Sequence, residues 1–296
     1  MSPRYKAPGV YVEEISALPP SIAEVETAVP AFIGYTEKAD KKGASLINVP
    51  TRIQSLVDYQ DYFGGEPEPE EIRVELDSNQ AVIDVEVTAR FYLYNSLRLF
   101  FENGGGKCYI VSVGTYKNGT HFNEVKLGGG NEPGLRKGLA ALESCDEPTI
   151  LLFPDGVLLD SDELASLQQA ALTQCSKLQD RVCILDIHNG FKPRSRDEKD
   201  VVTVFRDGIG MNHLKYGAAY YPWIETTFSY PADASSLKDM NGNPLDRNQI
   251  GEGMNAIVDR IEKEPVVLPP SGAIAGIYAA VDSKRGVWKA PANVSL

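Results

Sequence analysis

Two ionisable side chains follow predicted strands of this chain, at places where an α/β enzyme carries catalytic groups. Asp155 comes directly after the apolar run 149–153, and His188 follows the apolar run 181–187. The carboxyl ends of parallel strands line the ligand-binding edge of an open α/β sheet. A carboxyl and an imidazole at this edge could act as general acid and general base, with Asn189 beside them. The pair is compatible with a cytosolic α/β enzyme that has a strand-end site.

The same residues have a simpler explanation as turn residues. Pro, Asp, Asn and Gly set the backbone angles of turns and bond locally, and they directly follow both apolar runs. Neither a nucleophile elbow nor a third catalytic partner accompanies Asp155 and His188. We therefore favour turn and packing roles for Asp155, His188 and Trp223, and we keep the enzyme as the alternative hypothesis.

The glycine-rich segments and the cysteines indicate neither a cofactor site nor a metal site. The loop 103–107 (NGGGK) resembles a fragment of a phosphate loop. It follows a predicted helix and precedes a predicted strand, the reverse of the order that aims helix amides at phosphate. The chain has four widely spaced cysteines without a CxxC pair, and three histidines. A zinc site is therefore not expected.

Apolar runs alternate with amphipathic helices through most of the chain. Helices with apolar residues three and four positions apart are predicted from residue 89 to the glycines at 104–106, at 135–142 and at 161–178. This alternation predicts an α/β fold with a mostly parallel sheet flanked by helices. The predicted strands are 28–35, 107–113, 149–153, 181–187 and 217–221.

Two further helices are predicted towards the end of the chain. Asn243 is expected to cap, and Pro244 to open, the first of them. Ser271 is expected to cap the second, which should end near Gly286. The acidic segment 66–71 is expected to be a solvated loop.

Charge and hydropathy limit the possible partners. The chain has 41 acidic and 29 basic residues and a formal net charge of −12, which repels a polyanionic backbone. No stretch approaches the roughly 18 to 20 consecutive apolar residues that span a bilayer. The N-terminus has no apolar segment of the signal-peptide type. We expect no nucleic-acid partner and no direct membrane insertion.

The first 26 residues are divided by four prolines into short extended pieces. Within them, Val10, Tyr11 and Val12 alternate across a short predicted strand. Such an arm could add to the open edge of another sheet. From the alternation alone, a frayed terminus is the better explanation.

Five segments together resemble the contractile tail sheath proteins of phages, pyocin-type particles and extracellular contractile injection systems. The longest and most specific is 268–293 (LPPSGAIAGIYAAVDSKRGVWKAPAN). The others are 8–14 (PGVYVEE), 29–36 (VPAFIGYT), 100–113 (FFENGGGKCYIVSV) and 216–224 (YGAAYYPWI). The resemblance extends from near residue 8 to the end of the chain.

The resemblance implies an assembly protein with no catalytic residues and no cofactor. Family members form stacked rings or helical strands of one protein around an inner tube protein, between a baseplate and a terminator or cap protein. On contraction they drive the tube through a target envelope. They assemble in the producer's cytoplasm and become part of a phage tail or a released tail-like particle.

The resemblance also assigns roles to parts of the chain. Residues 1–26 become an extended linking arm, 27–264 an outer α/β body, and 265–296 the start of a C-terminal inner domain. Family members continue beyond this segment, so we expect the inner domain to be incomplete here. The intersubunit linking residues are Pro8, Gly9, Val10, Tyr11, Val12, Glu13 and Glu14. The family motif near the inner layer is Pro269, Pro270, Ser271, Gly272, Gly276, Arg285, Gly286, Trp288, Pro291 and Asn293.

Overall fold

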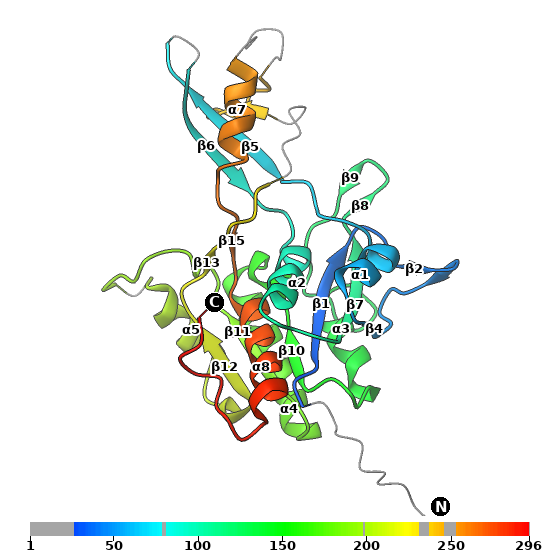
Figure 1. Ribbon diagram of the computed structural model, residues 1–296. Coiled ribbons are helices and arrows are strands. Elements are labelled where there is room, and N and C mark those ends of the chain that lie inside the picture. Colours follow the sequence, from blue (N-terminus) through cyan, green and yellow to red (C-terminus); the bar gives the residue numbers. More distant parts are fainter. Residues whose placement is uncertain (1–26, 79–80, 198, 231–236, 246–252, 296) are drawn as a thin grey trace, which may run out of the picture.

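The chain folds into a large α/β body and a smaller unit that stands on one end of it, which we call the knob (Figure 1). The structure is a computed structural model that describes residues 27–78, 81–197, 199–230, 237–245 and 253–295. The linking arm predicted at residues 8–14 lies outside the described residues. The six buried side chains of the knob core are separate from the cores of the body.

The body is built on a six-stranded sheet in the order β12-β11-β10-β1-β7-β4. Five strands pair in parallel, and β4 pairs antiparallel with β7 at one edge. The mostly parallel sheet predicted from the sequence is therefore confirmed. Its strands are β1 (Pro30–Thr36), β4 (Thr51–Ile53), β7 (Cys108–Thr115), β10 (Ile150–Leu152), β11 (Val182–Asp186) and β12 (Gly217–Tyr220).

Helices cover both faces of this sheet (Figure 1). Because β1 is buried along its whole length, its side chains alternate between two cores. Phe32 packs in the core on one side of the sheet, and Ile33 packs in the core on the other side. On the Phe32 side lie α1 (Leu56–Phe63), α2 (Leu93–Glu102) and α8 (Ser271–Arg285). On the Ile33 side lie α3 (Leu135–Ala141) and α4 (Ser161–Leu178), with α5 (Val201–Ile209) beside α4.

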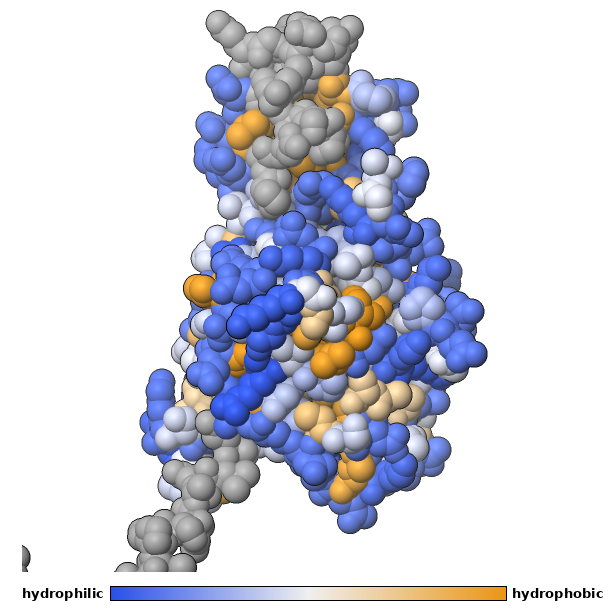
Figure 2. Space-filling view, turned by 90° about the vertical axis from the view of Figure 1, so that its right-hand side faces the viewer, coloured by the Kyte–Doolittle hydropathy of each residue, from blue (hydrophilic) through white to orange (hydrophobic). Residues whose placement is uncertain are grey.

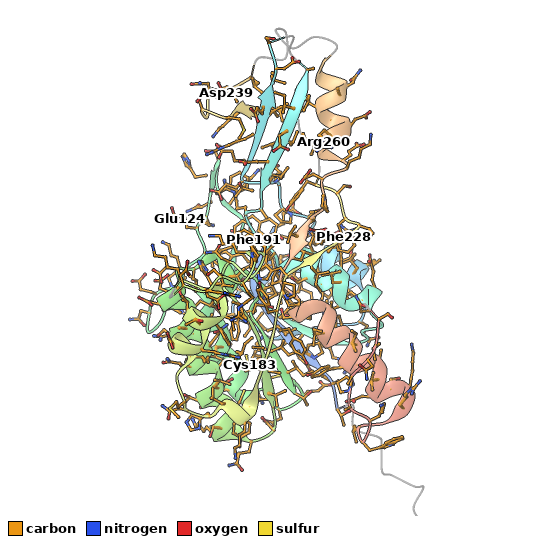
Figure 3. All side chains as sticks on the ribbon, turned by 90° about the vertical axis from the view of Figure 1, so that its left-hand side faces the viewer. Glu124, Cys183, Phe191, Phe228, Asp239 and Arg260 are labelled. Atoms are coloured by element: carbon orange, nitrogen blue, oxygen red, sulfur yellow. The ribbon has the colours of Figure 1, made fainter. Side chains whose placement is uncertain are left out.

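The knob is a three-stranded sheet with one helix on it. β5 (Glu71–Leu76) lies between β6 (Val82–Thr88) and β14 (Leu237–Asp239), and α7 (Gly253–Ile261) packs on one face. Figure 3 shows Asp239 and Arg260 on this unit, well away from Cys183 in the body sheet. Its core consists of Ile72, Val74, Val85, Leu237, Ile257 and Ile261, all nearly inaccessible to solvent. This unit was not predicted from the sequence.

A two-stranded neck joins the knob to the body. β13 (Ile224–Glu225) leaves the body and pairs antiparallel with β15 (Val267–Leu268), which returns to it. Phe228 is buried at this junction, and the Arg98 guanidinium lies 3.7 Å from the centre of its ring. The segments on either side of the knob therefore enter the body together, although they are about forty residues apart in the chain.

Short elements complete the described chain. The hairpin strands are β2 (Asp40–Lys41), β3 (Ala44–Ser45), β8 (Lys117–Asn118) and β9 (His121–Phe122), and the 3-10 turns are Leu142–Ser144, Pro154–Leu158 and Leu214–Tyr216. None of the described helices is long and apolar enough to cross a membrane. Figure 2 shows the face that carries α1 and β2 as mostly hydrophilic, with apolar side chains gathered near its middle. In the segment from β2 to α1, the large apolar side chains that are exposed are Val49 and Val57.

Two predicted helix starts are wrong. Asn243 closes a turn by donating its backbone and side-chain N–H groups to Asp239, and Pro244 bridges to Lys238 instead of opening a helix. Ser271 is the first residue of α8 rather than its cap, because Pro270 occupies the cap position without a side-chain bond. The predicted end of α8 near Gly286 is confirmed, since Gly286 is its C-cap with a positive φ of 83°.

Candidate functional site

The first half of the motif 268–293 is buried and fixed to the body sheet. Asp186 is the last residue of β11 and is 4% exposed. Its carboxylate accepts the backbone N–H of Ser271 at 3.1 Å and the Ser271 hydroxyl at 2.5 Å. The first N–H groups of a helix have no partner within the helix, so a strand residue here satisfies the start of α8. Desolvation by burial raises the pKa of Asp186 to about 7.

Two motif glycines let α8 lie directly against the backbone of α2. A Cβ atom on Gly272 would lie 2.2 Å from the carbonyl oxygen of Ser96, and one on Gly276 would lie 2.5 Å from that of Phe100. The two glycines are four residues apart and therefore share one face of α8. Each turn of that face meets a backbone carbonyl of α2, so no larger residue fits without separating the helices.

Further contacts extend the anchoring along α8. The hydroxyls of Tyr220, at the end of β12, and Tyr278 are 2.6 Å apart. Near the other end of the helix, the Thr27 hydroxyl donates to Asp282 at 2.6 Å. Thr27 is the first residue that the structure describes. The residue that follows the predicted arm in sequence therefore lies beside the C-terminal turn of α8.

The second half of the motif is exposed. Pro269, Pro270, Ser271, Gly272 and Gly276 are buried, whereas the side chains after the helix face solvent. Trp288 is 82% exposed and Val287 is 63% exposed. Arg285 and Asn293 are also exposed and line a groove of about 370 Å³ between α8 and the following segment, while Gly286 and Pro291 are partly buried. The motif thus joins a buried anchor to an exposed apolar and basic surface.

Asp155 has a structural task. It is fully buried and accepts three backbone N–H groups, those of Tyr35 at 2.7 Å, Tyr92 at 2.6 Å and Leu93 at 3.0 Å. The last two lie at the start of α2, so Asp155 satisfies that helix as Asp186 satisfies α8. Desolvation by burial raises the pKa of Asp155 to about 6, against the effect of these three hydrogen bonds.

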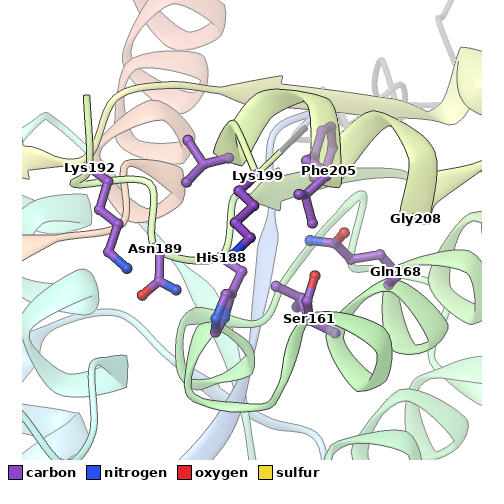
Figure 4. Close-up of a pocket in the computed structure, with 12 residues that line it drawn as sticks. Ser161, Gln168, His188, Asn189, Lys192, Lys199, Phe205 and Gly208 are labelled. Carbon is purple, nitrogen blue, oxygen red and sulfur yellow. The ribbon is translucent and has the colours of Figure 1, made fainter. Parts of the chain in front are cut away.

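His188 lies apart from this carboxyl. Its Nδ1 is 3.1 Å from the carbonyl oxygen of Val157, and its ring lines a pocket between α4 and α5 that Asp155 does not line (Figure 4). The structure therefore does not bring the two groups together as an acid–base pair. Trp223 is buried and donates its indole N–H to the Ile187 carbonyl, which is the packing role predicted for it. Among the described residues, no group of three or more metal-binding side chains could hold an ion.

Neither buried helix anchor was predicted from the sequence. Asp155 was predicted to be a turn residue, and no role was predicted for Asp186. One feature of the sequence could have indicated the anchor at Asp186, which is a single carboxylate at the end of an otherwise apolar strand. Such a group is costly to bury without hydrogen-bond donors, so it implies a partner. Its partner, 85 residues further along the chain, could not be identified from spacing.

Comparison with solved structures shows what the chain resembles. No family model and no curated protein matches it. Two chains from structures of the anti-feeding prophage (AFP) match at TM-score 0.51, one described as the baseplate and one as the helical sheath in contracted state. Their identities are 25% and 26%, and each match covers 99% of this chain and 57% of the other. A chain of the AFP baseplate in contracted state has the same fold, at 23% identity and TM-score 0.56, and the match covers 99% of this chain and 59% of that one.

These matches show which class of protein the chain resembles. It is similar to chains of contractile injection system sheaths and baseplates, as the sequence motifs indicated. The matched chains come from a 6-fold symmetrised baseplate and a helical sheath. The chain spans 57% of the length of these two relatives.

Proposed function

We propose that this chain is a structural subunit of a contractile sheath, which polymerises around an inner tube and contracts to drive the tube through a target envelope. The observation that carries the proposal is the match to the contracted AFP helical sheath over 99% of the chain at 26% identity. The match includes the body, the knob and the motif on α8. Copies of the subunit form a homo-oligomer, and its other partners are the inner tube protein, the baseplate and a cap protein.

The arm at residues 8–14 links each subunit to a neighbour in this proposal. Its alternating Val10, Tyr11 and Val12 suit a strand that adds to a sheet edge. The contact between Thr27 and Asp282 supports the link, because it holds the residue that follows the arm in sequence against α8, which leads into the exposed end of the motif. Trp288 and its neighbours then form the surface that faces the inner layer. The boundaries at residues 26 and 265 are part of the same proposal.

Contraction requires a subunit that moves as a rigid body while its links persist. The buried anchors at Asp155 and Asp186 support this, since they hold α2 and α8 to the sheet at one end. The extended sheath stores its energy in contacts between subunits and is kinetically trapped until the baseplate releases it. Assembly takes place in the producer's cytoplasm, and the finished particle is a phage tail or a released tail-like particle.

Electron microscopy of the chain, expressed with the inner tube protein from its own gene neighbourhood, tests the proposal. Hollow striated cylinders are expected. The variant V10S/Y11S/V12S should lose the cylinders and keep the unfolding midpoint of the wild type, because the changed residues precede in sequence all the residues that form the cores of the body. The matched control S16G/S21G changes the same arm outside the linking residues and should still assemble. Cylinders that persist in the triple variant would contradict the linking role, and dispersed wild-type monomers would contradict the sheath.

A further inference from the structure

A small basic pocket opens on the body at the carboxyl end of the sheet. It lies between α4 and α5, beside the loop that follows β11, and has a volume of about 150 Å³. Leu164 and Phe205 give it an apolar wall, and Lys192, Lys199, His188 and Asn189 give it a polar one. In Figure 4 the side chains of Lys199, His188 and Ser161 point towards the same space. We call this the α4–α5 pocket.

The pocket carries positive charge that the described chain does not neutralise. None of the described residues that line it is acidic. The ammonium groups of Lys192 and Lys199 have no ion pair within the described residues. The adjacent carboxylate of Asp200 is occupied, since it accepts from Arg194, from the Ser195 N–H and from Thr203. Among the described residues, the pocket therefore offers two cations without an ion pair over an apolar wall, which suits a carboxylate on an aliphatic stem.

Its size favours a side chain over a free ligand. Pockets for small molecules commonly enclose about 300 to 1,000 Å³, and this one encloses about half the lower value. One glutamate side chain fits such a space. The chain has 41 acidic against 29 basic residues, so copies of it repel one another unless acidic surfaces meet the few free basic ones.

The knob presents an acidic surface of this kind. On the face of its sheet opposite α7, Glu75 pairs across the strands with Asp84, and Arg73 pairs with Glu86. Although Arg73 lies opposite Glu86 in the strand register, its side chain donates to Glu71, and so does the side chain of Lys238. The exposed carboxylates of Glu75, Asp84 and Glu86 have no ion pair within the described residues. Like charges directly opposite each other destabilise a strand pair, so a cationic partner on this face would relieve a cost that the single chain bears.

We propose that the α4–α5 pocket of one copy receives a carboxylate from the acidic knob face of a second copy. The inference rests on the proposed function, because it assumes that copies of the chain assemble. The two surfaces lie on different parts of the same molecule, so the contact is head-to-tail. Repetition of a head-to-tail contact generates rings or helical filaments instead of closed dimers.

Charge reversal on each surface tests the contact in solution. The variants K192E/K199E and D84K/E86K each place like charges across it, and every changed side chain is exposed or at the pocket rim. By sedimentation at low ionic strength, wild type should self-associate, and each variant alone should associate at least about tenfold more weakly. An equimolar mixture of the two variants should recover association, because each then meets a complementary surface. Added salt should weaken both the wild-type contact and the mixed one.

A matched control separates this contact from a general effect of charge. K137E/K263E makes the same change in net charge at exposed lysines outside the pocket, and it should associate as wild type does. Wild type that stays monomeric, K192E/K199E that associates normally, or a mixture that fails to recover would each overturn the proposal. Cylinders formed by K192E/K199E would overturn the pocket contact while leaving the sheath function in place.

Discussion

Asp186 and Ser271 are 85 residues apart in the chain, yet two hydrogen bonds join them in the buried interior of the body. The carboxylate at the end of β11 holds both the first N–H of α8 and the hydroxyl of the same residue. Because α8 leads into the exposed part of the motif, this pair helps to fix the direction in which Arg285 and Trp288 leave the body. The pair is therefore the first place to test how the motif is held.

The variant D186A should lower the free energy of unfolding by about 2 to 3 kcal/mol, because it leaves the Ser271 N–H buried without an acceptor. S271A removes only the hydroxyl and should cost about 1 kcal/mol. D186N should fall between them, since its amide can accept the N–H and donate to the hydroxyl. Equilibrium urea unfolding measures all three. Equal losses for D186A and S271A would contradict the anchoring role of the carboxylate.

The same carboxyl should make stability depend on pH. Burial raises the pKa of Asp186 from 3.8 to about 7, so the folded state binds its proton more tightly than the unfolded state does. The stabilisation of the folded state by this tighter proton binding is fully present below about pH 4 and is lost as the pH rises through 7. D186N has no proton to lose, so its stability relative to wild type should increase between pH 5 and pH 8. Urea unfolding of both proteins at the two values gives the difference, and a constant or decreasing difference would contradict the assignment.

The body sheet could be predicted from the sequence because its strands are buried on both faces. β1, β7 and β11 are nearly continuous apolar runs, and the helices between them carry one apolar stripe each. The helix anchors could not be predicted, because they join residues that share no local pattern. Serine is a residue type that commonly caps helices, but the Ser271 hydroxyl donates to Asp186. These two residues come together only when the sheet has formed.

The knob was missed for a different reason. Residues 71–76 alternate apolar and charged side chains, as a half-buried strand does, but only the acidic segment 66–71 was interpreted, as a loop, and no strand was predicted after it. The strand that completes the sheet comes from Leu237–Asp239, more than 160 residues later. Only that pairing and the packing of Ile257 and Ile261 give the alternation a core to face.

Glycine at position 272 should be essential for the contact between α8 and α2. G272A places a Cβ atom 2.2 Å from the Ser96 carbonyl oxygen, and backbone cannot retreat as a flexible side chain can. We expect a loss of about 3 kcal/mol in the free energy of unfolding. The matched control is G106A, whose Cβ would meet nothing within 4 Å, and which should change stability by less than about 0.5 kcal/mol. Similar unfolding curves for the two variants would show that the helices can separate without cost.

The knob should unfold independently of the body when its core is weakened. Ile257 is fully buried against Ile72, Val74 and Val85, and none of these belongs to a core of the body. I257A should cost the knob about 3 kcal/mol. Hydrogen exchange followed by mass spectrometry should show faster exchange in β5 and β6 and unchanged exchange in β1 and β7. Faster exchange throughout the body would mean that the two units unfold together.

Asp155 and His188 give the last prediction, which separates a structural carboxylate from a catalytic one. D155A leaves three backbone N–H groups without an acceptor at the start of α2 and beside β1, so we expect a loss of at least about 3 kcal/mol in the free energy of unfolding. D155N should rescue only part of it, because both carboxylate oxygens accept N–H groups and an amide offers one acceptor. H188A removes one hydrogen bond of a partly exposed ring and should cost about 1 kcal/mol or less. An enzyme would show the reverse pattern, since catalytic groups are bound to substrate rather than to the fold. D155A that unfolds like wild type would return Asp155 to the list of candidate catalytic acids.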